Sequence, residues 1–175
     1  APTAGTGTAI TFHPDPSIFP EILFDRTTVL DHLRQQAYLT KGVTILVEDL
    51  RDQPDSAKRL MDSAFDPKAA AIIPTLATYT FRFEGGIASF VRHLNHRKDV
   101  AHDAVFYVEK EAEGINVEVA LQYNKDFKEN VLSFANNIFN PEGGTHVAGF
   151  RTALTRTLNA YARAKGYLKE KDENL

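Results

Sequence analysis

The chain has 175 residues, the size of one ordinary domain or of two very small ones. Its 43% hydrophobic and 25% charged residues are typical of a folded globular protein, and the formal net charge of -3 excludes a polycation. The absence of cysteine excludes disulfides, thiolate metal sites and a cysteine nucleophile. No stretch reaches the roughly 18 consecutive apolar residues of a membrane helix, so no membrane partner is expected.

The first half of the chain alternates between strand and helix patterns. Residues 8–12 alternate as a strand does, until the prolines of HPDPSIF interrupt the pattern. From Thr27 the apolar residues have helical spacing, and Gly42 provides a stop. A strand, GVTILVEDL, follows. Residues 53–77 lack a clear period and are interpreted as a surface insertion.

The second half has cleaner periodicity. Residues 78–83 alternate strictly, and residues 87–94 have the spacing of a helix. Strands are expected at 105–108, 115–123 and 131–138, with a turn at Glu113 and Gly114, and a long helix is expected at 145–165. This order predicts an α+β fold, in which helices cover one face of a sheet.

The sequence contains none of the common catalytic motifs. It has no G-x-x-x-x-G-K-[ST], G-x-S-x-G or H-E-x-x-H pattern, so no catalytic residue and no metal site are expected. His93 and His96 have a spacing that could chelate a metal, but a solvated helix end is favoured. His102 and Asp103 are interpreted as turn residues rather than as a catalytic pair.

Two glycine pairs stand where a strand gives way to a helix: Gly85–Gly86 and Gly143–Gly144. Free amides at a helix start can bind an anion, but paired glycines also simply permit a sharp turn, and the turn is the favoured interpretation. Thr145 is predicted to cap the second helix through its side-chain oxygen.

Charge is distributed unevenly along the chain. The long helix expected at 145–165 carries four cations and no acid: Arg151, Arg156, Arg163 and Lys165. Basic and hydroxyl side chains without aromatics suit contacts to the phosphates of a nucleic acid. The alternative is an ordinary solvated helix face, and composition alone does not decide between the two.

Five segments carry a family resemblance: TFHPDPSIF, LRQQAYLTKGVTI, FEGGIASFVRHLN, GINVEVALQYN and SFANNIFNPEGGTHVAGFRTALTRTLNAYARAKG. They resemble the transducer domain of the gyrase B-type component of bacterial type IIA DNA topoisomerases, the group of DNA gyrase and topoisomerase IV. The last segment is the most specific, and the matches cover nearly all of the chain except residues 53–77. Gyrase and topoisomerase IV are not distinguished by these segments.

The resemblance implies one transducer domain over residues 1–175, with both ends cut from a longer chain. Its fold is expected to contain a left-handed βαβ crossover and to be incomplete at the C-terminus. The family's ATP and Mg²⁺ bind elsewhere in the full-length protein, so this chain is expected to hold no cofactor. Since no Gln-Thr-Lys loop is present, it is also expected to lack ATPase activity alone.

The implied function is to couple ATP binding and hydrolysis upstream to gate motion and DNA strand passage in the cytoplasm. The implied partners are double-stranded DNA, the topoisomerase A subunit and a second copy of the gyrase B-type protein. Arg151, in the GFR motif, is the leading candidate for lining the cavity of the transported duplex, followed by Arg156 and Arg163. An independent nucleic-acid-binding module and a structural interaction module remain as alternatives.

Overall fold

The computed structural model describes residues 7–51 and 77–175. They belong to two compact units, the first ending at Tyr123 and the second running from Asn124 to Leu175. The insertion expected at 53–77 therefore lies outside the described residues, except for Ala77, which begins a strand.

The first helix, α1, spans Arg26–Leu39. It begins there because Asp25 caps it: Asp25 Oδ1 accepts a hydrogen bond of 2.7 Å from the Thr28 amide. The chain leaves the helix through Gly42, whose φ of +78° favours glycine. The helix predicted from Thr27 is confirmed.

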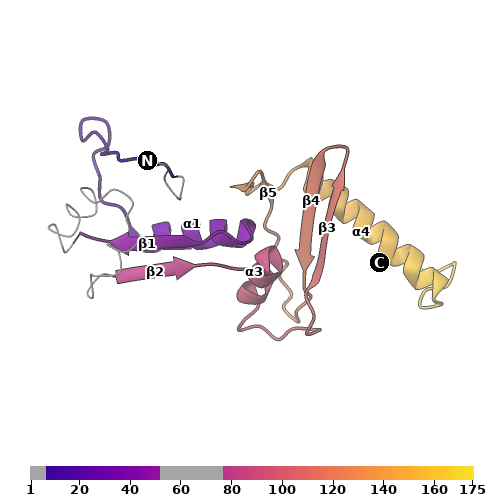
Figure 1. Ribbon diagram of the computed structural model, residues 1–175. Helices are drawn as coiled ribbons and strands as arrows, with labels where there is room; N and C mark the ends of the chain where they lie inside the picture. Colours follow the sequence, from indigo (N-terminus) through magenta and orange to yellow (C-terminus); the bar gives the residue numbers. More distant parts are fainter. Residues whose placement is uncertain (1–6, 52–76) are drawn as a thin grey trace, which may run out of the picture. The chain divides into compact units, whose positions relative to one another are not determined.

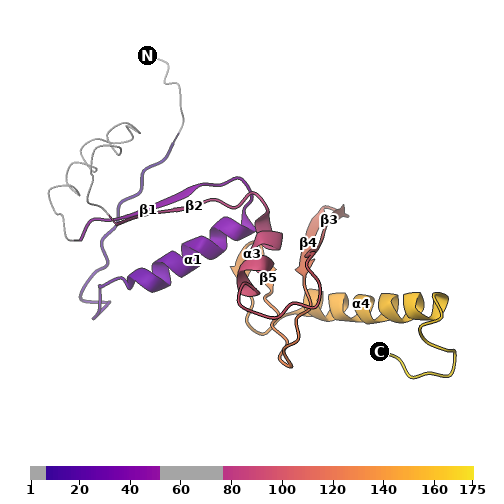
Figure 2. The ribbon, with the colours of Figure 1, turned by 90° about the horizontal axis from the view of Figure 1, so that it is seen from below.

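Strands β1 (Ile45–Asp49) and β2 (Ala77–Phe81) form an antiparallel pair, with Ile45 opposite Phe81. Figures 1 and 2 show α1 running along this pair, and α1 contacts both strands. The core of the first unit lies between them: Leu30, Ala37 and Phe81 are buried, and half-buried apolar side chains of both strands pack against them.

Helix α3 (Gly86–Leu94) packs on α1 and on β4. Aromatic rings join it to α1. The buried ring of Tyr38 stacks on Phe83 at 3.6 Å and on Phe90 at 4.9 Å between ring centroids. Tyr38 therefore links α1, the end of the β2 segment and α3.

Strands β3 (Phe106–Ala112) and β4 (Ile115–Leu121) form a second antiparallel hairpin. Its two-residue turn has φ of +55° at Glu113 and +76° at Gly114, so the turn predicted at these residues is confirmed. The pairing places Tyr107, Glu109 and Glu118 on one face, because cross-strand partners and alternate residues point the same way.

The second unit contains two short strands and the longest helix. Strands β5 (Phe134–Ala135) and β6 (Ile138–Phe139) pair around Asn136 and Asn137, and α4 spans Thr145–Ala164. The single strand expected at 131–138 is therefore wrong. Both asparagines have positive φ, +48° and +64°, and turn the chain back on itself.

Helix α4 is confirmed, and the apolar residues that helical spacing places along one side of it are unevenly buried. Val147, Phe150 and Leu154 are half-buried, whereas Leu158 is 39% and Tyr161 55% exposed. The buried residues of the helix are Asn159 and Ala162. They are buried because the chain after α4 returns to this side, where the Leu175 amide donates to Asn159 Oδ1 at 2.9 Å.

The α+β class is confirmed, since helices accompany small antiparallel sheets in both units. The strand pairs among residues 7–51 and 77–175 are three separate antiparallel pairs. They do not include a single larger sheet or the left-handed βαβ crossover, which joins parallel strands. Residues 8–12 form no strand, because they have no hydrogen-bonded partner strand in this part of the chain. None of the described helices is long and apolar enough to cross a membrane.

Candidate nucleic-acid interface

The candidate interface begins at the start of α4. The N-cap is Gly144, which has no side chain to cap the helix, so the N-cap predicted at Thr145 is off by one residue. The Gly144 carbonyl accepts from the amides of Val147 and Ala148, both at 3.1 Å. Gly143, with φ of +79°, provides the turn into the helix, in keeping with the turn interpretation of this glycine pair.

The other glycine pair begins α3 in the same uncapped manner. Gly85 is the N-cap and Gly86 has φ of +51°. A Cβ atom built on Gly86 would lie 2.6 Å from Lys41 Cε and 2.8 Å from Lys41 Cγ. The stem of Lys41 thus crosses the helix start over Gly86, and a side chain at this position would have to displace it.

Arg151 lies on the exposed surface of α4. Its Nη2 atom donates to Glu129 Oε2 at 2.8 Å, and the two side chains are 53% and 64% exposed. An ion pair this exposed contributes about 0–1 kcal/mol, so the guanidinium can exchange its carboxylate partner for a phosphate at little cost. Arg151 is paired, but it is not buried.

Arg156, one and a half turns further along α4, is exposed. Among the described residues it has no ion pair and no hydrogen bond through its guanidinium. Its charge is therefore uncompensated on a helix that has no acidic residue. Of the predicted arginines, Arg156 is the one most open to an external anion.

Arg163 is held by the end of the chain. Its guanidinium donates to the carbonyl oxygens of Lys169 at 2.8 Å and Asp172 at 3.2 Å, and to Asn174 Oδ1 at 2.7 Å. Three acceptors occupy donors that a phosphate would need. Lys165, the next cation, lies over the Tyr161 ring at 5.9 Å from its centroid. The C-terminal part of α4 is therefore engaged by its own unit, and Arg151 and Arg156 are left as the stronger candidates.

His146, in the first turn of α4, makes a contact that the sequence did not predict. The buried Ser133 hydroxyl lies 2.6 Å from His146 Nε2 and fixes the helix start against the β5 segment. The backbone strengthens this junction, since the Asn140 amide donates to the Ser133 carbonyl at 2.8 Å. This contact orients the first turn, from which Arg151 is little more than one turn away.

In the first unit, a cluster of polar side chains surrounds the Lys41 ammonium. Lys41 Nζ contacts Glu118 at 2.8 Å, Glu109 at 3.0 Å and the Tyr107 hydroxyl. Hydrogen bonds from Tyr107, Lys41 and Asn116 lower the pKa of Glu109 to about 2, and burial with the nearby carboxylates raises the pKa of Tyr107 to about 12. The cluster ties the segment after α1 to the β3–β4 hairpin.

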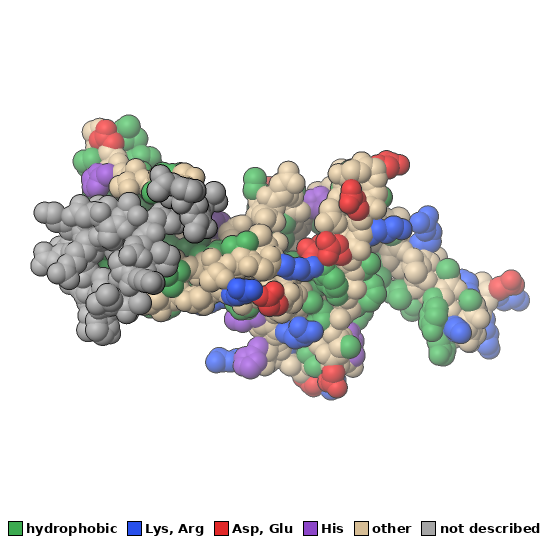
Figure 3. Space-filling view, in the orientation of Figure 1, with side chains coloured by type: hydrophobic (Ala, Val, Ile, Leu, Met, Phe, Trp, Pro, Cys, Tyr) green, Lys and Arg blue, Asp and Glu red, His purple; other side chains and the backbone are tan. Residues whose placement is uncertain are grey.

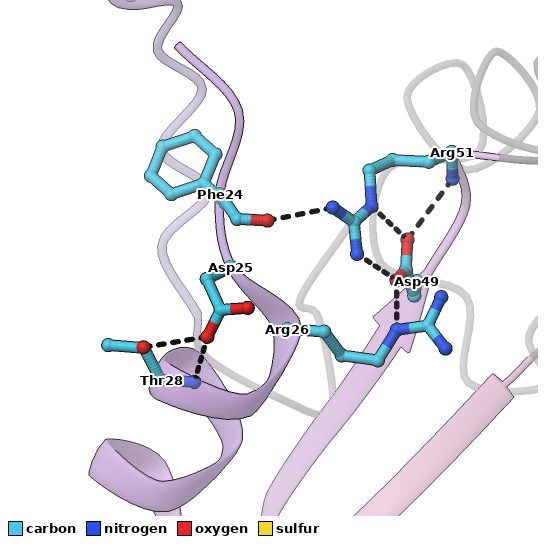
Figure 4. A network of polar contacts seen from close by, with 6 residues as sticks. All are labelled: Phe24, Asp25, Arg26, Thr28, Asp49 and Arg51. Carbon is cyan, nitrogen blue, oxygen red and sulfur yellow. Dashed lines mark hydrogen bonds and ion pairs between the residues drawn. The ribbon is translucent and has the colours of Figure 1, made fainter. Parts of the chain in front are cut away.

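A second network of hydrogen bonds and ion pairs lies at the start of α1 (Figure 4). Asp49, only 12% exposed, accepts from Arg26 Nε at 2.8 Å and from Arg51 Nε at 2.9 Å and Nη2 at 2.6 Å. Arg51 also donates to the Phe24 carbonyl at 2.7 Å. The hydrogen bonds from Arg51, followed by those from Arg26, hold the pKa of Asp49 well below its usual range. The network fixes the segment before α1 to the end of β1.

The histidine interpretations can be compared with the structure. The Tyr123 amide donates to His102 Nε2 at 3.0 Å, so the other ring nitrogen carries the proton and donates to the Ala104 carbonyl at 2.6 Å. His102 is thus a loop residue whose ring makes local hydrogen bonds to the backbone, in keeping with its interpretation as a local structural residue. Within residues 7–51 and 77–175, no group of three His, Asp or Glu side chains is placed to hold a metal ion.

The family model for DNA gyrase B matches residues 86–175 of this chain. This part corresponds to the transducer region of gyrase B. The DNA gyrase B protein of Halalkalibacterium halodurans is 42% identical over 99% of this chain and 24% of its own length. The DNA gyrase B protein of Clostridium acetobutylicum is 43% identical over 97% of this chain and 23% of its own length.

The solved structures that this chain resembles also include gyrase B proteins. The ATPase domain of Thermus thermophilus gyrase B, crystallised with an aminocoumarin, matches 91% of this chain and 37% of its own, with a TM-score of 0.68 and 28% identity. The gyrase B protein of Myxococcus xanthus matches with a TM-score of 0.69 at 22% identity, which supports the fold alone. The chain spans about a quarter of the length of the curated relatives that it matches.

Proposed function

This chain belongs to the DNA gyrase B family, and we propose that it acts as the transducer segment of an ATP-dependent type II DNA topoisomerase. It couples ATP binding and hydrolysis in another part of the gyrase B protein to gate motion and DNA strand passage. Its α4 helix lines the cavity that receives the transported duplex. Double-stranded DNA, the topoisomerase A subunit and a second gyrase B protein are the partners, and the cytoplasm is the location.

The observation that carries the DNA contact is the charge on α4. The helix has no acidic residue, Arg156 is exposed and uncompensated among the described residues, and Arg151 is exposed in a weak ion pair. Contacts of arginine with phosphate hold a duplex without reading its sequence, as transport of any segment requires. Arg163 contributes less, because the C-terminal segment already binds its guanidinium.

The coupling role rests on how the first unit is fastened together. The Asp49 network fixes the chain on the N-terminal side of α1, and the Lys41 cluster fixes the chain on its C-terminal side to β3–β4. Elements joined at both ends in this way move as one body when either end is displaced. ATP and Mg²⁺ supply the driving energy elsewhere in the full-length protein, and this chain alone does not hydrolyse ATP.

The proposal is tested with Arg151→Ala and Arg156→Ala in the full-length protein. We expect both variants to impair DNA-stimulated ATP turnover more than basal turnover, because the arginines meet DNA and not nucleotide. Lys110→Ala, which removes an exposed cation from β3, serves as the control. Equal loss of stimulated and basal turnover in a steady-state assay would refute the DNA contact.

A further inference from the structure

A second cationic surface lies at the end of α3. Five of the seven residues from 92 to 98 are cationic or imidazole side chains: Arg92, His93, His96, Arg97 and Lys98. We refer to these five residues as the α3 basic end. The first two lie in the last turn of the helix and the others in the turn that follows. Figure 3 shows blue and purple side chains close together on the face that carries α3.

The backbone that presents these side chains is held in place. The Asn95 amide donates to the Val91 carbonyl at 3.1 Å, and the Lys98 amide donates to the Asn95 carbonyl at 2.9 Å. The Asn95 side chain donates to Gln122 Oε1 at 3.1 Å and so ties the turn to the end of β4. A surface ordered in advance loses less conformational entropy when it binds a partner.

The two arginines of this surface are uncompensated. Arg92 and Arg97 are exposed, and among the described residues neither has an ion pair. Their neighbours in the same unit differ: Arg34 pairs with Asp31 at 2.8 Å and Arg82 with Glu84 at 2.6 Å. The helix dipole favours a cation in the last turn, which accounts for Arg92, but Arg97 lies beyond the helix.

The chemistry of the surface indicates a phosphate-rich partner. Interfaces with proteins are commonly anchored by buried aromatic or arginine side chains surrounded by apolar contacts. The exposed side chains of the α3 basic end are Arg92, His93, His96 and Arg97, with no exposed apolar or aromatic side chain among them. Guanidinium and imidazole groups on a fixed backbone are donors that contact phosphate oxygens. An acidic peptide would find charge here but no anchor.

We propose that the α3 basic end binds the phosphate backbone of a DNA duplex as a contact surface in addition to α4. The identity of the partner rests on the proposed function, whereas the residues are different. In α4 the contacts come from Arg151 and Arg156, and here they come from Arg92 and Arg97.

The test measures binding of the whole chain to a short fluorescein-labelled duplex by fluorescence anisotropy over a range of salt concentrations. The slope of log K against log salt is negative, and each lost phosphate contact reduces its magnitude by about 0.9. Arg92→Gln with Arg97→Gln should therefore reduce the magnitude by about 2. The matched control is Lys110→Gln with Lys171→Gln, which removes the same charge from exposed positions elsewhere. Circular dichroism verifies that each variant remains folded.

The outcomes separate this inference from the proposed function. Loss of slope in the α3 variant, with no such loss in the control, supports the contact. Three results would overturn it. The α3 variant could have the slope of the unchanged chain, the control could lose as much slope, or polyglutamate at equal charge concentration could displace the duplex. Loss of slope only in Arg151→Gln with Arg156→Gln overturns the α3 contact while supporting the α4 one.

Discussion

Replacing Gly86 by alanine tests the junction between α1, α3 and the β3–β4 hairpin. Gly86 has φ of +51°, and the new Cβ would lie 2.6 Å from Lys41 Cε and 2.8 Å from Lys41 Cγ. The left-handed backbone costs an L-residue about 1–2 kcal/mol. The contact also forces the Lys41 stem aside, so the ammonium leaves Glu118, an ion pair whose side chains are 37% and 27% exposed.

A partly exposed ion pair contributes about 0.2–1 kcal/mol. We therefore expect Gly86→Ala to lower the free energy of unfolding by about 1–3 kcal/mol, measured by urea denaturation followed by circular dichroism. Gly42→Ala is the matched control: Gly42 has φ of +78° and nothing within 4 Å of a built Cβ. It should lower the free energy of unfolding by the backbone contribution alone, about 1–2 kcal/mol.

A double-mutant cycle isolates the contact with Lys41. In a Lys41→Ala background the stem is gone, so Gly86→Ala should fall to the value of Gly42→Ala. Two results would show that the Lys41 side chain does not require the space over Gly86. Either Gly86→Ala and Lys41→Ala would have additive effects on the free energy of unfolding, or Gly86→Ala and Gly42→Ala would destabilise the unchanged chain equally. The account of the junction would then be wrong.

Three further outcomes follow from the contacts. Tyr38→Ala should lower the free energy of unfolding by about 3–5 kcal/mol in urea denaturation, whereas Tyr38→Phe, which keeps the stacked ring, should have little effect. Glu129→Gln should raise duplex affinity up to about fivefold in an anisotropy assay, because it releases Arg151 from its ion pair. The pKa of Glu109 is lowered to about 2, so its contribution to stability is present above its ordinary value near 4.5 and is lost as the pH falls toward 2; Glu109→Gln should flatten that part of a denaturation profile.

Local pattern was enough to predict most of the helices and strands. Helices α1, α3 and α4 followed from apolar spacing, and the β3–β4 turn followed from Glu113 and Gly114. The hairpin at Asn136 and Asn137 was missed because apolar residues on both sides concealed it as one strand. The Asn-Asn pair was the available indication, since asparagine tolerates the positive φ that a tight turn requires.

Pairing between distant side chains was beyond the reach of sequence pattern. Arg26 and Asp49 are 23 residues apart, and Lys41 and Glu109 are 68 apart, so no local spacing relates them. Asn159 is a polar residue of α4 that is nevertheless buried, because the last residue of the chain returns to it. Each of these contacts depends on tertiary structure that periodicity does not encode.

Whether a cation of this chain is paired with an internal carboxylate determines its role. Lys41, Arg26 and Arg51 are bound by internal carboxylates, so changing them should alter the stability of the first unit before it alters any binding. Arg156 has no such partner among the described residues, so changing it removes no internal ion pair there, and its effect should appear in the salt dependence of DNA binding. The sequence does not distinguish the paired cations from the unpaired ones, because both are lysines and arginines of the same charge. The function of each is decided by whether the fold supplies its anion or leaves it to a partner.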